Sequence, residues 1–425
     1  MRIGKLNWPV FAIAAFVLLL AINYYSIQRK KVRHALPIGD ALPQVSIAAT
    51  HGVIIASDGS LWSWGSDFLG WPVLGTAGVT NQTALRRVGH DHYWASVSAG
   101  TSHNLAITKY GTLWAWGENI RHQVDDSAAP SRDHPVPSVP GNDWQQAAAG
   151  GTFSIALKKN GTLWAWGDNW AGQLGIGSTN DSALPVQMGI ATNWTKVWAG
   201  NANGMGLQND SSLWIWGDNP ALANQQARSA KNLLSPTRVS SDTNWVEAAF
   251  ASQAFLALKS DGTLWIWGRY ASNYTRVNNQ ADVPNRLGTN NDWQSISSSE
   301  WARDLYIVLR KRDGTIWTME SSIASGGTIK LTQVPLQKEI AVVAGGGGGE
   351  HGVQMMHDGI CTGLAVARDG EVWVWGRSLG YTPPFVGLQG LTGMMRRAHI
   401  DVHWGDPHPI ARPLPELLPA YDQKN

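Results

Sequence analysis

Hydrophobic and polar residues alternate along short stretches of this chain with a period of two, which is typical of β-strands. Two such stretches, Phe153-Ser-Ile-Ala-Leu157 and Thr162-Leu-Trp-Ala-Trp166, are joined by Lys158-Lys-Asn-Gly161. Asn-Gly is a strong signal for a tight hairpin in which both turn residues have positive φ. The pattern therefore predicts a β-hairpin whose two tryptophans, two residues apart, project from one face of the sheet.

This hairpin sequence recurs seven times at intervals of 50 to 56 residues, with first residues Asp58, Tyr110, Asn160, Asp210, Asp261, Asp313 and Asp369. A run of small residues precedes it, as in Gln146-Ala-Ala-Ala-Gly150, and a proline-containing segment comes after it, as in Leu184-Pro-Val-Gln187. Small residues suit a strand near a central axis, and proline suits an outer edge strand. Seven units of four short strands predict an all-β fold, a seven-bladed β-propeller.

Most of the 24 tryptophans fall at fixed places in the repeat. Those of the Trp-x-Trp pairs are Trp62, Trp64, Trp114, Trp116, Trp164, Trp166, Trp214, Trp216, Trp265, Trp267, Trp373 and Trp375, with Trp317 in the degenerate sixth unit. Five more precede the small-residue strand: Trp94, Trp144, Trp194, Trp245 and Trp293. Because their positions follow the repeat, we interpret these indoles as packing between blades and not as a sugar or choline cage.

The repeated sequence, together with Gly172-Gln-Leu-Gly175 in the third unit, resembles the regulator of chromosome condensation repeat family over residues 44 to 390. The resemblance implies a propeller ring closed by strands from both chain ends, here from the segments around Leu36–Val45 and Pro384–Leu388. The fourth unit departs from the pattern with Ser211 in place of the turn glycine. The family includes a nucleotide exchange factor for a nuclear GTPase, but the inserted wedge that it uses has no counterpart here. A branch that resembles a secreted bacterial β-lactamase inhibitor is the closer analogy, so we expect a bacterial-type member.

An apolar run near the start of the chain has the length of a membrane span. Residues 6–28 carry no charge, and Trp8 to Ile27 would form a helix roughly 30 Å long. A cleaved signal peptide is the alternative, but the run is long and lacks a small-x-small cleavage site. We therefore expect one transmembrane helix, a single-pass membrane protein, with domains at 1–34 (anchor with basic flanks), 35–390 (propeller) and 391–425 (closing or tail segment).

The sequence gives less direct evidence on which side of the membrane the propeller lies. The basic residues flanking the run, two before and four after, slightly favour a cytoplasmic body. An N-terminal anchor with a basic start commonly exports the domain after it, and the body is rich in Trp, Asn, Ser and Thr. We expect the propeller to be extracytoplasmic.

Charge and cysteine content exclude several classes of function. Without those six basic residues the chain carries 27 basic and 31 acidic residues, so it lacks the basic surface that nucleic acids require. The single cysteine, Cys361, permits no intrachain disulfide, and we interpret it as a structural residue packed within a strand. The recurring Asp-Gly carboxylates are explained by turn formation. We expect no cofactor, no nucleic-acid partner and no catalytic residue.

Two segments outside the regular repeat carry candidate binding residues. A long glycine-rich joint in the seventh unit contains Glu350, His351, His357 and Asp358. The alternatives for it are a flexible loop without a ligand, a loop that binds a partner, and a metal site. Near the C-terminus, His399, Asp401 and His403 would share a strand face and form a weak candidate metal site.

Seven structural repeats without a convergent catalytic set predict a non-enzymatic scaffold. We expect it to be tethered to the membrane by its N-terminal helix and to bind a protein partner through its face loops. The alternatives are a propeller that binds or hydrolyses carbohydrate, with a cell-envelope glycan as ligand, and an enzyme inhibitor.

Overall fold

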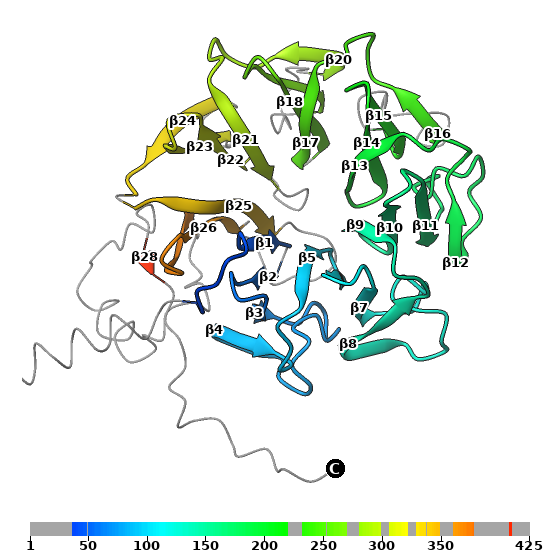
Figure 1. Ribbon diagram of the computed structural model, residues 1–425. Coiled ribbons are helices and arrows are strands. Elements are labelled where there is room, and N and C mark those ends of the chain that lie inside the picture. Colours follow the sequence, from blue (N-terminus) through cyan, green and yellow to red (C-terminus); the bar gives the residue numbers. More distant parts are fainter. Residues whose placement is uncertain are drawn as a thin grey trace, which may run out of the picture.

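The computed structural model describes residues 36–48, 50–219, 232–251, 253–269, 280–298, 306–321, 329–336, 338–348, 360–377 and 408–409. In these ranges the chain forms seven four-stranded antiparallel sheets around a central axis, as Figure 1 shows. The predicted all-β, seven-bladed propeller is therefore confirmed. The described part contains no helix with the length and hydrophobicity of a membrane span. The helix expected within residues 1–34 lies outside that part.

Each blade runs from an inner strand at the axis to an outer strand at the rim. Blades 1 to 3 comprise β1 Gln44–Ile47, β2 His51–Ile55, β3 Leu61–Ser66 and β4 Asn81–Val88; β5 Trp94–Ala99, β6 His103–Thr108, β7 Leu113–Glu118 and β8 Ser131–Val139; and β9 Trp144–Ala149, β10 Phe153–Lys158, β11 Leu163–Gly167 and β12 Ser182–Gln187. Blades 4 and 5 comprise β13 Trp194–Ala199, β14 Asn203–Gln208, β15 Leu213–Gly217 and β16 Leu233–Arg238; and β17 Trp245–Ala251, β18 Gln253–Lys259, β19 Leu264–Arg269 and β20 Gln280–Arg286. Blades 6 and 7 comprise β21 Trp293–Ser298, β22 Tyr306–Lys311, β23 Ile316–Ser321 and β24 Ile329–Val334; and β25 Ile340–Gly348, β26 Ile360–Ala367, β27 Val372–Arg377 and β28 His408–Pro409.

The tight turn between the second and third strands differs from the expected form. In blade 3 the Gly161 N–H donates to the Lys158 carbonyl (2.9 Å) and the Lys158 N–H donates to the Thr162 carbonyl (3.0 Å). Gly161 has φ of +78°, but Asn160 is not among the residues with positive φ. This is a three-residue turn with a glycine bulge, so the expectation of positive φ at both turn positions is wrong. Asn160 contributes through its side chain, whose Oδ1 accepts hydrogen bonds from the N–H and hydroxyl of Thr162.

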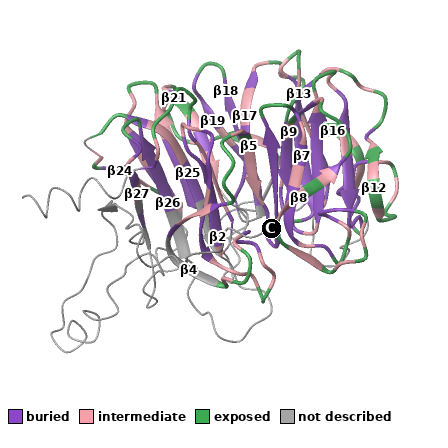
Figure 2. Ribbon diagram, turned by 60° about the horizontal axis from the view of Figure 1, so that its bottom comes forward, coloured by how far each residue is buried: buried purple, intermediate pink, exposed green. Residues whose placement is uncertain are grey.

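The second tryptophan of each pair is buried against the preceding blade. Trp166 packs with Leu105, Leu113 and Val124 of blade 2, and its indole N–H donates to the Gln123 carbonyl (3.1 Å). The same bond joins Trp116 to Val73 and Trp216 to Gln173. In the degenerate sixth unit Met319 fills the position and packs with residues of blade 5. Each blade therefore inserts one large side chain into its neighbour, and burial follows the strands in Figure 2.

Among the described residues, the strands of the two chain ends belong to blades 1 and 7, and no strand of one end pairs with a strand of the other. Strand β1 pairs with β2 in blade 1, and the fourth strand of blade 7 is His408–Pro409. Leu36 is buried with Leu364 and Val366 of blade 7, and its N–H donates to the Gly370 carbonyl (2.7 Å). The segment Pro384–Leu388 lies outside the described residues.

Candidate functional site

The antiparallel order of each blade gives the ring two different faces. On the first, which we call the hairpin face, lie the turns between second and third strands and the links between blades. On the second, the loop face, lie the connections from first to second and from third to fourth strands. The chain enters at the hairpin face, because Leu36 and Ala41 bond to carbonyls of the turns at Gly370 and Ser57.

On the hairpin face, the recurring turn carboxylate serves the tryptophan beside it. The Trp265 indole N–H donates to Thr263 Oγ1 (2.8 Å), and the Thr263 hydroxyl and N–H both donate to Asp261 Oδ1 (2.6 and 2.9 Å). The hydrogen bond from the Thr263 side chain lowers the pKa of Asp261. The same relay runs through Asn160, Thr162 and Trp164 in blade 3. The Asp/Asn-Gly-Thr-Leu-Trp sequence is thus one hydrogen-bonded unit.

A lysine of the same chain occupies the space between paired indoles in three blades. Lys259 Nζ lies 4.7 and 4.1 Å from the rings of Trp245 and Trp265, and 3.0 Å from Asp242 Oδ2. Lys158 and Lys311 make the equivalent contacts in blades 3 and 6. These cation–π sites are already filled from within the chain. They therefore offer no cage to an external cation.

Beneath the loop face, buried polar side chains connect neighbouring blades. His51 Nε2 lies 2.8 Å from Asn104 Oδ1, and His103 Nε2 lies 2.9 Å from Ser154 Oγ. Burial lowers the pKa of His51 to about 4 and that of His103 to about 3. Both rings are therefore neutral near pH 7 and have a structural role between blades.

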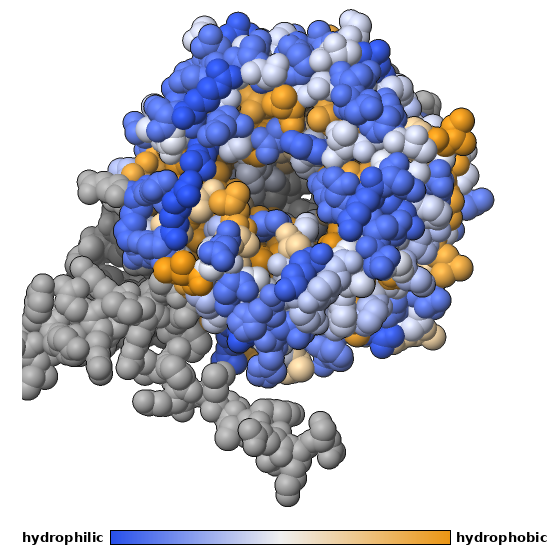
Figure 3. Space-filling model, viewed as in Figure 1, coloured by the Kyte–Doolittle hydropathy of each residue, from blue (hydrophilic) through white to orange (hydrophobic). Residues whose placement is uncertain are grey.

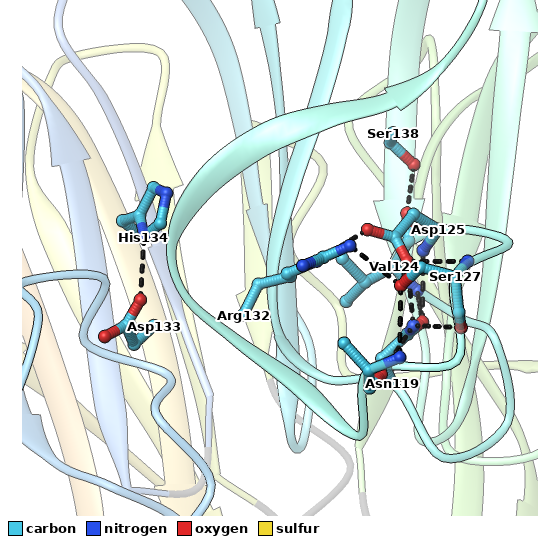
Figure 4. A network of polar contacts seen from close by, with 9 residues as sticks. Asn119, Val124, Asp125, Ser127, Arg132, Asp133, His134 and Ser138 are labelled. Carbon is cyan, nitrogen blue, oxygen red and sulfur yellow. Dashed lines mark hydrogen bonds and ion pairs between the residues drawn. The ribbon is translucent and has the colours of Figure 1, made fainter.

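A buried asparagine organises the connection between the third and fourth strands. In blade 2, the Asn119 side chain donates to Asp125 Oδ1 (2.8 Å) and accepts the N–H groups of Val124 and Asp125 (both 3.0 Å), as Figure 4 shows. Arg132 Nε closes the network on Asp125 Oδ2 (2.7 Å). In blade 3, Asn169 accepts the Leu174 N–H in the same way (2.9 Å).

The residue at the tip of this loop is apolar and exposed in three consecutive blades. Ile120 follows Asn119 directly and is 54% exposed, and Trp170 follows Asn169 and is 61% exposed. In blade 1, Asp67 takes the place of the asparagine by accepting the Leu74 N–H (3.3 Å), and Leu69 nearby is 62% exposed. These residues are not among those predicted from the sequence. The signal that reveals them is the apolar residue after Asn in Trp-Gly-Glu-Asn-Ile and Trp-Gly-Asp-Asn-Trp.

The ring encloses a central channel of about 470 Å³ that is lined by the inner strands, mostly with small side chains. Figure 3 shows apolar side chains around this opening, on a face that is otherwise mostly polar. Glu247 is the one carboxyl among the described lining residues. Burial raises its pKa to about 7, and its Oε2 accepts the Ile296 N–H of the next blade (3.0 Å).

Side chains of this kind join six of the seven neighbouring pairs of inner strands, from blade 1 through to blade 7. The bridging bonds are Ala99 N to Ser46 Oγ, Ala149 N to Ser98 Oγ, Val197 N to Gln146 Oε1, Lys196 Nζ to Val246 O, Ile296 N to Glu247 Oε2 and Gly345 N to Ser297 Oγ. Since an inner strand is a sheet edge, these bonds satisfy backbone groups that would otherwise lack a partner. We call them inter-blade latches.

The site residues proposed from the sequence are not brought together by the described part of the chain. Glu350, His351, His357 and Asp358 lie outside it, as do His399, Asp401 and His403. The connection that contains the first four joins β25 to β26, whose ends Gly348 and Ile360 are paired on the loop-face side. Cys361 lies in β26. Among the described residues, no group of three His, Cys, Asp or Glu side chains has a metal-binding arrangement.

Known proteins share the sequence repeat and the propeller ring described above. A model of the regulator of chromosome condensation (RCC1) repeat matches residues 160–207, and a second RCC1 repeat model matches 94–123 and 144–173. Human protein RCC2 is 34% identical over 77 residues, which are 18% of this chain and 15% of RCC2. The Arabidopsis thaliana ultraviolet-B receptor UVR8 is 29% identical over 99 residues, which are 22% of this chain and 21% of the receptor. Rat alsin is 28% identical over 85 residues, which are 20% of this chain and 5% of alsin. The matches thus span about a fifth or less of each relative's length.

Solved structures show the same fold at low sequence identity. Human WBSCR16 superposes with a TM-score of 0.58 at 16% identity, covering 72% of this chain and 85% of its own. Yeast RCC1 (Prp20), solved with Kap60 bound, gives 0.59 at 18% identity and covers 72% and 78%. A further structure of Saccharomyces cerevisiae Prp20p, described with its binding to Gsp1p and histones, gives 0.58 at 17% and covers 72% and 80%. The chain therefore contains RCC1 repeats and folds as a seven-bladed β-propeller.

Proposed function

We propose that this protein is a non-enzymatic scaffold that binds a protein partner through its loop face and is tethered to a membrane by its N-terminal segment. The proposal rests on where the polar and charged groups of the repeat make their contacts. In blade 5, for example, the Asp261 carboxylate, the Trp265 indole N–H and the Lys259 ammonium group are all engaged inside the ring. A set of loop tips stays free on the rigid ring, and rigid scaffolds commonly present binding residues in this way.

The relatives support binding rather than catalysis. The two yeast propeller structures are described with protein partners, Kap60 in one and Gsp1p and histones in the other. Shared fold does not transfer a partner, so the identity of the partner has to follow from this chain's own surface.

The entry point of the chain supports an orientation for the tether. Leu36, the first described residue, is fixed at the hairpin face by its bond to Gly370. A membrane helix within residues 1–34 would therefore lie on the hairpin-face side, and the loop face would point away from the membrane. We propose further that the ring lies outside the cytoplasm, as expected from the sequence.

Two experiments test these proposals. The first is a reporter fused after Asn425 that is active only outside the cytoplasm. We expect the reporter to be active, which would place the ring outside the cytoplasm. Crosslinking of intact membranes with photoreactive residues placed at loop-face positions reports the partner, and a reproducible protein adduct is expected. Capture of glycan without any protein adduct would favour the carbohydrate-binding alternative, because Trp170 is an exposed indole on that face.

A further inference from the structure

Ile120 and Trp170 occupy equivalent places on blades 2 and 3, and Leu69 lies in the corresponding, longer loop of blade 1. Leu69, Ile120 and Trp170 each lie in the loop that leaves the third strand, one or two residues after a side chain that accepts a backbone N–H of the same loop. We call these residues, with the loops 67–80, 119–130 and 168–181 that carry them, the tip surface. Leu69 has φ of +51°, a strained conformation for a residue whose side chain is exposed.

The tip surface is held rigid and is continuous across the three blades. The Ala77 N–H of the first loop donates to the Asp133 carbonyl of blade 2 (3.1 Å). Arg121 of the second loop lies 3.6 Å from Asp181 of the third, and the Gly177 N–H of the third donates to the Leu234 carbonyl of blade 4 (2.8 Å). Since the loops are ordered before any partner arrives, their apolar tips can act as anchors with little further loss of entropy.

Acidic residues surround the apolar tips. The three loops and the strand residues that flank them carry seven carboxylates and two arginines: Asp67, Glu118, Asp125, Asp126, Asp133, Asp168 and Asp181 against Arg121 and Arg132. Arg132 and Asp125 neutralise each other within the loop (2.7 Å), and Asp125 and Asp168 are buried. Asp126, Asp133 and Asp181 are exposed and are the carboxylates that a partner can reach. The inner loops beside them, residues 48–50, 100–102 and 150–152, add no charge.

Apolar anchors within a negative field fit one kind of partner. We propose that the tip surface binds a protein segment in which lysine or arginine side chains are interspersed with aliphatic or aromatic ones. Its apolar side chains would contact Leu69, Ile120 and Trp170, and its cations would contact the carboxylates around them. This inference rests on the proposed function and adds to it the binding surface and the chemistry of the partner.

A peptide experiment tests the chemistry with the purified full-length chain. Three fluorescent peptides share the same Leu and Phe positions and carry Lys and Arg, Ser and Asn, or Asp and Glu at the others. We expect the basic peptide to bind at least about tenfold more tightly than the acidic one, and to weaken with added salt. Equal binding of all three peptides, or binding of none, would overturn the inference.

The surface is tested with variants that leave the core intact. Trp170→Ala and Ile120→Ser should each weaken binding of the basic peptide at least about fivefold. Ile190→Ser is the matched control, because Ile190 belongs to blade 3 and is 94% exposed but lies in a link on the hairpin face. Unchanged affinity in Trp170→Ala and Ile120→Ser, or an equal loss in Ile190→Ser, would show that the peptide binds elsewhere.

Photocrosslinkers at positions 170 and 190 in cells separate the two proposals. A protein adduct at 170 whose crosslinked segment is basic supports both. An acidic segment at 170, or a reproducible protein adduct at another loop-face position with none at 170, overturns the tip surface and leaves binding through the loop face in place. No protein adduct at any loop-face position overturns both.

Discussion

Glu247 is the one inter-blade latch on the described channel wall that has a carboxyl group. Glu247→Gln replaces this carboxyl with an amide, which does not ionise. Glu247 Oε2 accepts the Ile296 N–H at 3.0 Å. The equivalent residue of blade 3 is Gln146, which makes two bonds to one residue: its Oε1 accepts the Val197 N–H (3.1 Å) and its Nε2 donates to the Val197 carbonyl (2.8 Å). A carboxylate can make only the first of these bonds, whereas a protonated carboxyl or an amide can make both.

The size of the effect depends on the pKa of Glu247. Burial raises it from its ordinary value of 4.5 to about 7, with Lys196 opposing the shift. The folded state therefore holds this proton more tightly than the unfolded chain. The stabilisation is complete below pH 4.5 and is lost as the pH rises through 7. At 1.36 kcal/mol per pKa unit, the loss is at most about 3 kcal/mol.

Urea unfolding of the full-length chain between pH 4.5 and 8 measures this effect. Glu247→Gln should match the wild type near pH 4.5 and exceed its unfolding free energy by up to about 3 kcal/mol at pH 8. Subtracting the two profiles cancels the histidines, which both proteins share. The matched control is Gln146→Glu, which should acquire the pH dependence that Glu247→Gln loses. A flat difference profile, or a Glu247→Gln protein that is less stable at pH 8, would refute the reasoning.

Three further changes probe other parts of the ring. Ser211 has φ of +62° at a turn where the other blades have glycine, so Ser211→Gly should raise the unfolding free energy by about 1 kcal/mol in urea titrations. Because the pKa of buried His51 falls from 6.5 to about 4, its stabilisation is complete above pH 6.5. About 3 kcal/mol of this stabilisation should be lost as the pH falls to 4. His51→Gln should abolish this part of the pH dependence of the unfolding free energy. Thermal unfolding should show a loss of about 3–5 kcal/mol for Trp166→Ala, which empties a blade interface, and less than about 0.5 kcal/mol for exposed Trp170→Ala.

The architecture could be predicted from the sequence because the repeat encodes local structure that each blade forms independently. The period-two alternation specifies the strands, and Asp261-Gly-Thr-Leu-Trp265 contains every member of one hydrogen-bond relay. The prediction of the turn geometry at Asn160 was wrong because Asn-Gly also fits a three-residue turn with a glycine bulge. That choice depends on the register of the flanking strands.

The latches and the tips could not be predicted because they depend on contacts between blades. Gln146, Lys196 and Glu247 occupy one position of successive inner strands and all reach backbone groups of the next blade. Any polar side chain of suitable length serves there, so no sequence signature arises. At the tips, Ile120 and Trp170 share only the preceding asparagine. The candidate residues Glu350 and His351 and their neighbours stay predictions.

Hydroxyl-radical footprinting of the full-length chain, with mass spectrometry of each tryptophan, tests the central claim most directly. The second indole of each described pair lies between blades, with exposures of 4% or less at Trp64, Trp116, Trp166, Trp216, Trp267 and Trp375. Trp170 lies on the loop face and is 61% exposed. The predicted result is rapid oxidation of Trp170 and at least about tenfold slower oxidation of those six. Oxidation of the six at the rate of Trp170 would contradict both the packing and the assignment of recognition to the loop tips.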